Sequence, residues 1–222
     1  MSDSELFNLQ ETGWVSWFCS LEEHSFLVEV EPDFLNDPFN HYGLKKLFPR
    51  FNEALQVILS PEIPEEDEDS ETRRFGELYH EAVELYGLLH SRYLETSRGM
   101  ALIREKHLNG VFGTCPRVLC GEQKVFPLGL SEKLKHSKVK IFCPACEEIY
   151  VPSKKYQDVD GAFFGTSLPH VFLKIFPELH CDKKIEYVPR LNGFRLFNHK
   201  GSKFSRQIEA TKTASDKPSQ TE

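Results

Sequence analysis

Two closely spaced pairs of cysteines constrain this chain more than any other feature of its sequence. The first pair is Cys115 and Cys120, the second is Cys143 and Cys146, and 22 residues separate the pairs. Each pair can direct two thiolates at one ion from a tight turn. Four thiolates complete a tetrahedral Zn²⁺ site with no open position for water or substrate. The spacing therefore predicts one structural, non-catalytic zinc ion per chain.

The residues between the two pairs fit the short hairpins of a zinc ribbon. Pro127 and Gly129 are turn-forming residues. Apolar residues alternate around them, which is typical of short strands. These residues are Val125, Leu128, Leu130, Val139 and Ile141. The alternative interpretation is two disulfide bonds, which require an oxidising compartment.

The N-terminus argues against the disulfide alternative. Residues 1–5 are polar and acidic, without the basic and apolar regions of a secretory signal. No stretch approaches the roughly 18 apolar residues of a membrane span. We therefore expect reduced cysteines, no membrane association, and a location in the cytoplasm and nucleus. Of the other two cysteines, Cys19 is interpreted as a small buried hydrophobic residue and Cys181 as incidental.

Charge divides the chain into an acidic and a basic part. Residues 1–71 carry 3 basic and 17 acidic side chains, whereas residues 72–222 carry 24 basic and 17 acidic ones. Such a chain can attract partners of opposite charge to different faces. Self-repulsion and flanking prolines predict an exposed acidic loop over residues 60–71. Its acidic residues are Glu62, Glu65, Glu66, Asp67, Glu68, Asp69 and Glu71.

Apolar residues recur at helical spacing through much of the chain before the cysteines. The expected helices cover residues 43–59, 72–94 and 97–108, and a shorter one begins at Pro32. Asn109 and Gly110 are expected to end the helix over 97–108. After the cysteines, residues 169–176 predict a strand or a short helix, and residues 187–197 predict an extended segment.

These patterns predict an α+β fold, in which a mostly helical N-terminal domain precedes a Cys₄ zinc-ribbon domain and an extended C-terminal segment. The polar residues at both ends favour disorder. The expected boundaries are 1–12 for the first tail, 13–109 for the helical domain, 110–180 for the zinc ribbon, 181–197 for the extended segment and 198–222 for the second tail.

The sequence lacks the common catalytic patterns. It has no glycine-rich phosphate loop, no G-x-S-x-G turn and no kinase His-Arg-Asp and Asp-Phe-Gly pair. His80 and Glu81 begin like a zinc-protease helix, but Glu84 stands where the second histidine is needed. We interpret these three residues as a solvated helix face. The chain is therefore expected to be a binding or regulatory protein and not an enzyme.

Several motifs occur together in the order and spacing of one known family. They are Trp14-Val-Ser-Trp-Phe-Cys19, the acidic loop, Leu85-Tyr-Gly-Leu-Leu-His-Ser-Arg-Tyr93, Cys115-Pro-Arg-Val-Leu-Cys120, Asp160-Gly-Ala-Phe-Phe-Gly165 and Val188-Pro-Arg-Leu-Asn-Gly-Phe194. Over about residues 13–197 the chain closely resembles the regulatory beta subunits of casein kinase II. The resemblance implies a non-catalytic subunit that forms a homodimer through its zinc region. It also implies docking of catalytic alpha subunits, which gives a tetramer of two alpha and two beta subunits that phosphorylates Ser and Thr in acidic contexts.

The resemblance assigns a set of residues to binding of the catalytic subunit. These are Val171, Leu191, Asn192 and Phe194, with Phe194 as the expected hot spot. Asn192 stands where the better-known members have tyrosine, and Val171 replaces a methionine. Both changes remove apolar contact area, so docking is expected to be weaker or the partner groove to have co-adapted. The simpler alternative is that Phe194 belongs to the core.

The resemblance also implies roles for three further regions. The acidic loop is expected to bind polyamines and basic proteins, with a plain solvated turn as the alternative. Ser2 and Ser4 lie in an acidic context and are candidates for phosphorylation, with an inert tail as the alternative. Val118, Leu119 and Ile141 are candidates for the dimer contact, with packing on the helical domain as the alternative.

A second class of function stays open from the sequence, namely a zinc-ribbon nucleic-acid-binding or transcription adaptor protein. Such a protein should cluster basic residues near its zinc-binding turns. Lysines do cluster between the cysteine pairs, at Lys133, Lys135, Lys138 and Lys140. The kinase regulatory subunit is nevertheless the favoured interpretation, and nucleic acid is not the expected partner. Co-purification with a kinase catalytic subunit or with nucleic acid would separate the two classes.

Overall fold

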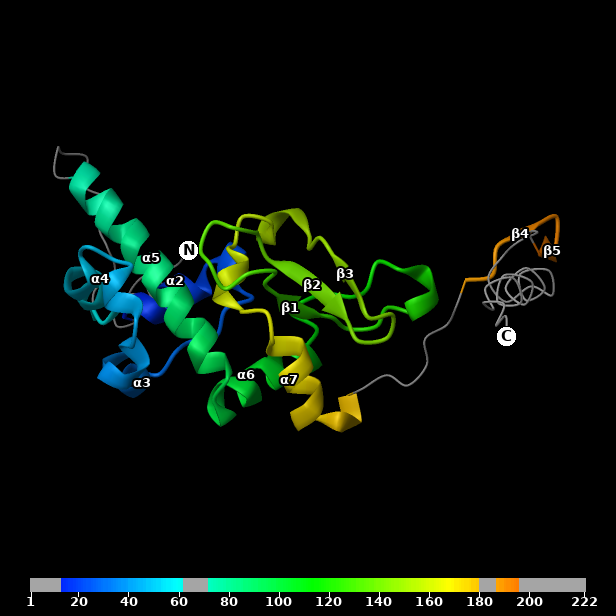
Figure 1. Ribbon diagram of the computed structural model, residues 1–222, viewed down its shortest axis with the longest axis horizontal. Coiled ribbons are helices and arrows are strands. Elements are labelled where there is room, and N and C mark those ends of the chain that lie inside the picture. The colour runs from blue at the N-terminus through cyan, green and yellow to red at the C-terminus, as the bar shows by residue number, and fades with distance from the viewer. Residues whose placement is uncertain (1–12, 62–71, 180–186, 196–222) are drawn as a thin grey trace, which may run out of the picture. The chain divides into compact units, whose positions relative to one another are not determined.

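The computed structural model describes residues 13–61, 72–179 and 187–195. The chain divides into two units, Met1–Lys183 and Lys184–Glu222. The first unit contains helices and a three-stranded sheet, and the second contains a two-stranded hairpin (Figure 1). The expected mixture of helix and sheet is therefore present. No helix of the described residues is both long enough and apolar enough to cross a membrane.

The helices of the first unit follow the apolar periodicity of the sequence. The α-helices are α2 (Trp14–Ser20), α3 (Pro32–Asn36), α4 (Phe51–Ile58), α5 (Thr72–Leu94), α6 (Ser97–Leu108) and α7 (Leu168–Ile175). The 3₁₀ helices are η1 (Glu22–His24), η2 (Pro38–His41), η3 (Leu44–Lys46), η4 (Val118–Cys120), η5 (Lys154–Tyr156), η6 (Gly161–Phe163) and η7 (Pro177–Leu179). The predicted bounds of α5 and α6 and the predicted start of α3 are confirmed. The segment over residues 169–176 proves to be a helix and not a strand.

The predicted continuous helix over residues 43–59 is wrong. The segment forms η3, a turn at residues 47–50, and then α4, which begins at Phe51. Pro49 explains the break, because proline lacks a backbone N–H and disfavours the helical conformation of the residue before it. The apolar periodicity continues across the turn, so periodicity alone did not reveal the break.

Helix α5 is the centre of the first unit. It packs against the shorter helix α4, and against α6 and η6 towards its C-terminal end (Figure 1). Its buried residues recur at helical spacing, and they are Ala82, Leu85, Tyr86, Leu89 and Tyr93. Aromatic residues of α2 cover the same face. The rings of Trp14 and Phe18 stack 4.6 Å apart, and both meet Tyr86 edge-on.

The sheet of the first unit is a short antiparallel meander. Its strands are β1 (Phe126–Leu128), β2 (Lys140–Cys143) and β3 (Glu148–Tyr150), in the order β1-β2-β3. Helix α7 packs on β1, with the rings of Phe172 and Phe126 4.7 Å apart. From α6, the ring of His107 stacks on Phe126 at 4.0 Å. The sheet therefore shares one hydrophobic core with the helices.

A fully buried histidine on α5 links segments that are far apart in sequence. The backbone N–H of Val28 donates to Nε2 of His90 over 3.0 Å, which leaves Nδ1 protonated to donate to the carbonyl oxygen of Phe163 over 2.7 Å. Burial lowers the pKa of His90 to about 4, so the ring is neutral. Close packing beside it requires Gly87, because a Cβ there would lie 2.0 Å from the ring of Phe163.

Replacing His90 with leucine tests this link. We expect His90→Leu to lower the free energy of unfolding by about 2–4 kcal/mol, because each buried polar group left unpaired costs about 1–3 kcal/mol. Urea unfolding of zinc-loaded protein measures the change. The matched control is His80→Leu on the exposed face of the same helix, which should change the value by about 0.5 kcal/mol or less. Equal effects of the two substitutions would contradict the assigned role of His90.

Candidate metal centre and docking hairpin

Four cysteines converge from two turns of the first unit. Cys115 lies before η4 and Cys120 is its last residue, Cys143 ends β2, and Cys146 lies in the turn before β3. Their Sγ atoms all lie within 4.8 Å of one another, and Sγ of Cys115 lies 3.9 Å from Sγ of Cys146. Zn–S bonds of about 2.3 Å in a tetrahedron place sulfurs about 3.8 Å apart, whereas a disulfide requires about 2.05 Å. The four sulfurs therefore fit one shared ion better than two disulfides.

Neighbouring groups direct hydrogen bonds at the sulfurs. The backbone N–H of Arg117 donates to Sγ of Cys115 over 3.4 Å, and Nη1 of the same residue lies 3.9 Å from Sγ of Cys120. The hydroxyl of Tyr150 lies 3.3 Å from Sγ of Cys146. Such outer contacts orient the ligands of a metal and stabilise thiolates. The sequence interpretation missed Arg117 and Tyr150. Arg117 lies between the first two cysteines, and Tyr150 lies four residues after Cys146. These positions were the available signals in the sequence.

The electrostatics of the cluster favour a bound cation. Burial raises the pKa of Cys120 and Cys143. Burial also raises the pKa of Cys146, but the hydrogen bond with Tyr150 and other contacts outweigh that effect and lower the pKa to about 7. Four thiolates this close together need a positive charge between them. When bound here, Zn²⁺ would supply a crosslink between the two turns, with all four positions filled by the cysteines.

The second unit presents a short hairpin with exposed apolar side chains. Its strands are β4 (Arg190–Leu191) and β5 (Phe194–Arg195), and Leu191 pairs directly with Phe194. Leu191 is 65% and Phe194 79% exposed. The predicted extended segment is present from 187 to 195. Phe194 is not buried within this unit, and its role as an anchor stays a prediction.

The predicted docking residues fall in both units. The hairpin brings Leu191, Asn192 and Phe194 together. Val171 lies on α7 in the first unit, half-buried against the core. The assignment of all four to one docking surface stays a prediction. Ser2, Ser4 and the acidic residues from Glu62 to Glu71 lie outside the described residues.

One candidate for the dimer contact belongs to the core instead. Ile141 is only 5% exposed, because it lies on β2, the strand between β1 and β3. Val118 is 92% exposed, and Leu119 is half-buried. Two apolar residues that follow the second cysteine pair, Ile149 and Val151, are also exposed. The exposed apolar surface around the cysteines therefore differs from the predicted one.

The interpretation of His80, Glu81 and Glu84 as a solvated face holds only for His80, which is exposed. Arg50 donates from Nη2 to Oε1 of Glu81 over 2.9 Å. Nζ of Lys135 lies 2.5 Å from Oε1 of Glu84. The two glutamates therefore tie α5 to the residue before α4 and to the loop before β2. No metal ligand set forms around them among the described residues.

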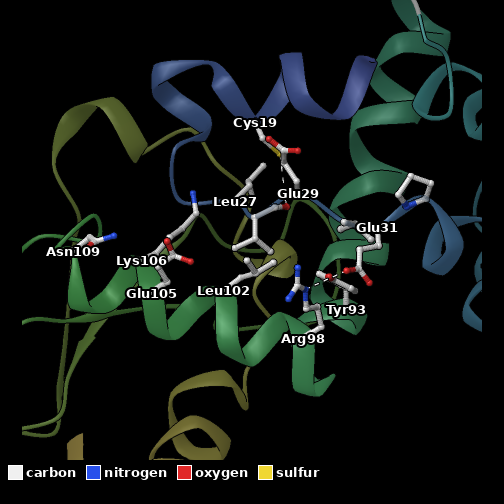
Figure 2. Close-up of a pocket in the computed structure, with 13 residues that line it drawn as sticks. Cys19, Leu27, Glu29, Glu31, Tyr93, Arg98, Leu102, Glu105, Lys106 and Asn109 are labelled. Carbon is white, nitrogen blue, oxygen red and sulfur yellow. Dashed lines mark hydrogen bonds and ion pairs between the residues drawn. The ribbon is translucent and has the colours of Figure 1, made fainter. Parts of the chain in front are cut away.

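A groove of about 490 Å³ with a mixed polar and apolar lining lies between residues 27–32 and α6 (Figure 2). An ion pair between Glu31 and Arg98, 3.1 Å long, spans one part of it. Nζ of Lys106, which also lines the groove, donates to the carbonyl oxygen of Ser25 over 2.8 Å. Burial raises the pKa of Cys19 to about 12, so this thiol is protonated and unreactive. Cys19 is partly and not fully buried, since it lines this groove.

The comparisons with known proteins agree on one family. The family model for the casein kinase II regulatory subunit matches residues 13–195. Casein kinase II subunit beta of Schizosaccharomyces pombe is 41% identical over 191 residues, which cover 84% of this chain and 80% of that protein. Subunit beta-3 of Arabidopsis thaliana is 42% identical over 193 residues, which cover 84% of this chain and 68% of that protein. Subunit beta′ of Drosophila melanogaster is 38% identical over 198 residues, which cover 88% of this chain and 87% of that protein.

The cysteine cluster makes a prediction about metal content. Purified, reduced protein should contain one zinc ion per chain, and Cys143→Ser should lose most of it because three thiolates no longer close the site. Elemental analysis by mass spectrometry measures both. The matched control is Cys19→Ser, which removes a thiol outside the cluster and should keep one zinc. Full zinc content in Cys143→Ser, or none in the wild type, would show that the four cysteines do not form this site.

Proposed function

Because the chain belongs to the casein kinase II regulatory subunit family, we propose that it forms a homodimer through a zinc ribbon and docks the catalytic alpha subunits of casein kinase II. The family is non-catalytic, and its role is regulatory. In the proposed complex the chain stabilises the holoenzyme and modulates its activity and choice of substrate. The observation that carries the proposal is that one family match, over residues 13–195, includes both the cysteine cluster and the exposed hairpin.

The zinc ribbon is the first part of the proposal. The sheet has strands of only three and four residues, and such short strands bury little surface by themselves. Binding of structural zinc contributes about 10–16 kcal/mol in small zinc-dependent peptides. A zinc ion held by the four cysteines would therefore account for much of the stability of this region.

The homodimer is the second part. Val118 lies between the first two cysteines and is 92% exposed, and Ile149 and Val151 follow the second pair and are 46% and 58% exposed. Exposed apolar side chains that gather in one region mark interaction surfaces. In a two-fold dimer the same patch of each copy meets its counterpart. Zinc would join the turn that carries Val118 to the turn that precedes Ile149 and Val151, which links metal binding to dimerisation.

The docking hairpin is the third part. A phenylalanine with 79% of its surface exposed, opposite an exposed leucine, fits the role of a buried anchor in a complex. Aromatic anchors at the centre of an interface commonly contribute most of the binding energy. The hairpin therefore supports the assignment of Leu191 and Phe194 as contacts for the alpha subunit.

The remaining roles follow from family membership and the sequence. The acidic loop from Glu62 to Glu71 is proposed to bind polyamines and basic proteins. Ser2 and Ser4 are proposed sites of phosphorylation. Reduced thiolates in the zinc site are compatible with the proposed location in the cytoplasm and nucleus.

The nucleic-acid alternative has weaker support. Within the lysine cluster from Lys133 to Lys140, Lys135 pairs with Glu84, and Nζ of Lys138 donates to the carbonyl oxygen of Asp158 over 2.6 Å. These two side chains are therefore engaged within the chain. A basic surface built to hold phosphates should instead present its lysines to the ligand.

The acidic loop makes a prediction about polyamine binding. Replacing Glu65, Glu66, Asp67, Glu68 and Asp69 with alanine should weaken binding of spermine to the full-length protein at low salt, because the Coulomb attraction is lost. The difference should shrink at high salt. Titration calorimetry measures both. A control with the same charge change replaces five exposed acidic residues elsewhere, namely Glu23, Asp33, Glu53, Glu105 and Asp158. Equal weakening in both variants would attribute binding to net charge and not to the loop.

The hairpin makes a prediction about docking. Phe194→Ala should keep its zinc and its dimer but bind the alpha subunit of casein kinase II about 30- to 1000-fold more weakly, since loss of a central aromatic anchor costs about 2–4 kcal/mol. Calorimetric titration of the zinc-loaded dimer with the alpha subunit measures the affinity. Phe39→Ala is the matched control, because Phe39 is 84% exposed in the first unit, and it should bind normally. Wild-type affinity in Phe194→Ala would contradict the docking assignment.

A further inference from the structure

The turn of the hairpin has an uncommon backbone conformation. Leu191 pairs with Phe194, so the loop consists of only two residues, Asn192 and Gly193. Their φ angles are +48° and +85°. A two-residue loop with both φ angles positive corresponds to a type I′ turn, whose twist matches the right-handed twist of the two strands. The turn therefore determines the geometry of the whole hairpin.

Asparagine is well suited to the first position of this turn. Most residues disfavour positive φ, because the Cβ atom comes too close to the backbone. Glycine adopts it freely, and asparagine and aspartate adopt it several-fold more often than other residues. Asn-Gly is accordingly among the strongest sequence signals for a two-residue hairpin. Asn192 thus affects the hairpin through its backbone conformation as well as through its contact area.

The register gives the hairpin two different faces. Side chains alternate between the faces of a strand, so Leu191 and Phe194 form a cross-strand pair on one face, and Arg190 and Arg195 form a pair on the other. All four residues are exposed. Nη1 of Arg190 donates to the carbonyl oxygen of Gly193 over 3.1 Å. Both residues of the apolar face, Leu191 and Phe194, therefore belong to the hairpin itself.

A hairpin with two residues in each strand is marginally stable in water. Directly opposed like charges, as in Arg190 and Arg195, reduce its stability further. The conformational preference of the turn residues therefore decides how often the free chain presents Leu191 and Phe194 side by side. Binding to a preformed element avoids the cost of ordering it in the complex.

We propose that Asn192 is the positioning residue of the docking hairpin. With Gly193 it sets a left-handed turn that holds Leu191 and Phe194 as a preformed pair of anchors for an apolar slot on the alpha subunit. The inference rests on the proposed function and deepens it by naming what the residue does at that site. Asn192→Tyr adds a ring but places it at a positive φ, so that variant should populate the hairpin less than the wild type in the free chain.

The test compares two truncations that differ in backbone preference. Asn192→Ala and Asn192→Gly both remove the side-chain amide, but only glycine retains easy access to positive φ. In the full-length, zinc-loaded dimer, Asn192→Ala should bind the alpha subunit about 5- to 30-fold more weakly. Asn192→Gly should stay within about threefold of the wild type. Calorimetry measures the affinities.

A second measurement examines the chain without its partner. Nuclear Overhauser contacts between the side chains of Leu191 and Phe194 report the population of the hairpin in the free dimer. They should persist in Asn192→Gly and weaken in Asn192→Ala and Asn192→Tyr. A purely contact-making role of Asn192 would leave them unchanged, so this measurement separates positioning from contact.

The outcomes distinguish this inference from the proposed function. Equal loss of affinity in the alanine and glycine variants, or unchanged Overhauser contacts in Asn192→Ala, would each overturn the positioning role. In those cases the wild type would still bind the alpha subunit, and the proposed function would stand. A wild-type chain that does not bind the alpha subunit would overturn both.

Discussion

Four buried or half-buried thiols within 4.8 Å of one another impose the constraint on which the rest of this structure depends. Ionised sulfurs at that separation repel one another, and burial opposes their ionisation. A cation among them removes both difficulties and joins two turns whose sheet is too small to be stable alone. Exposed Val118 lies in the first of these turns, exposed Ile149 lies on the strand after the second turn, and exposed Val151 follows that strand. The proposed dimer is therefore a consequence of the metal centre.

The cysteine region is not isolated from the helices. His107 of α6 stacks on Phe126 of β1, and His90 of α5 bonds the carbonyl oxygen of Phe163 beyond the sheet. Burial keeps both rings neutral by lowering the pKa of each. One core thus carries the metal centre and the long helix α5 together. The hairpin of the second unit, by contrast, depends for its shape on its own turn.

Local patterns in the sequence predicted the local features well. The bounds of α5 and α6 follow from apolar periodicity and from Asn109 and Gly110, and the convergence of the four cysteines follows from their spacing. The prediction of one helix over residues 43–59 rested on apolar periodicity and did not take account of Pro49, which divides that segment. The bonds of His90 were beyond prediction, because its partners lie 62 and 73 residues away in the chain. The burial of Ile141 depends likewise on strand order. Asn192 was singled out from the sequence for its small contact area, whereas its positive φ angle was not predicted.

Native mass spectrometry of the chain mixed with the alpha subunit of casein kinase II is the sharpest test of zinc-dependent pairing, because it counts chains and metal ions in one measurement. We expect a complex of two copies of this chain, two catalytic subunits and two zinc ions. Addition of a zinc chelator should break the pairing of the two copies. A complex that contains a single copy of this chain, or a dimer that assembles without zinc, would contradict the account.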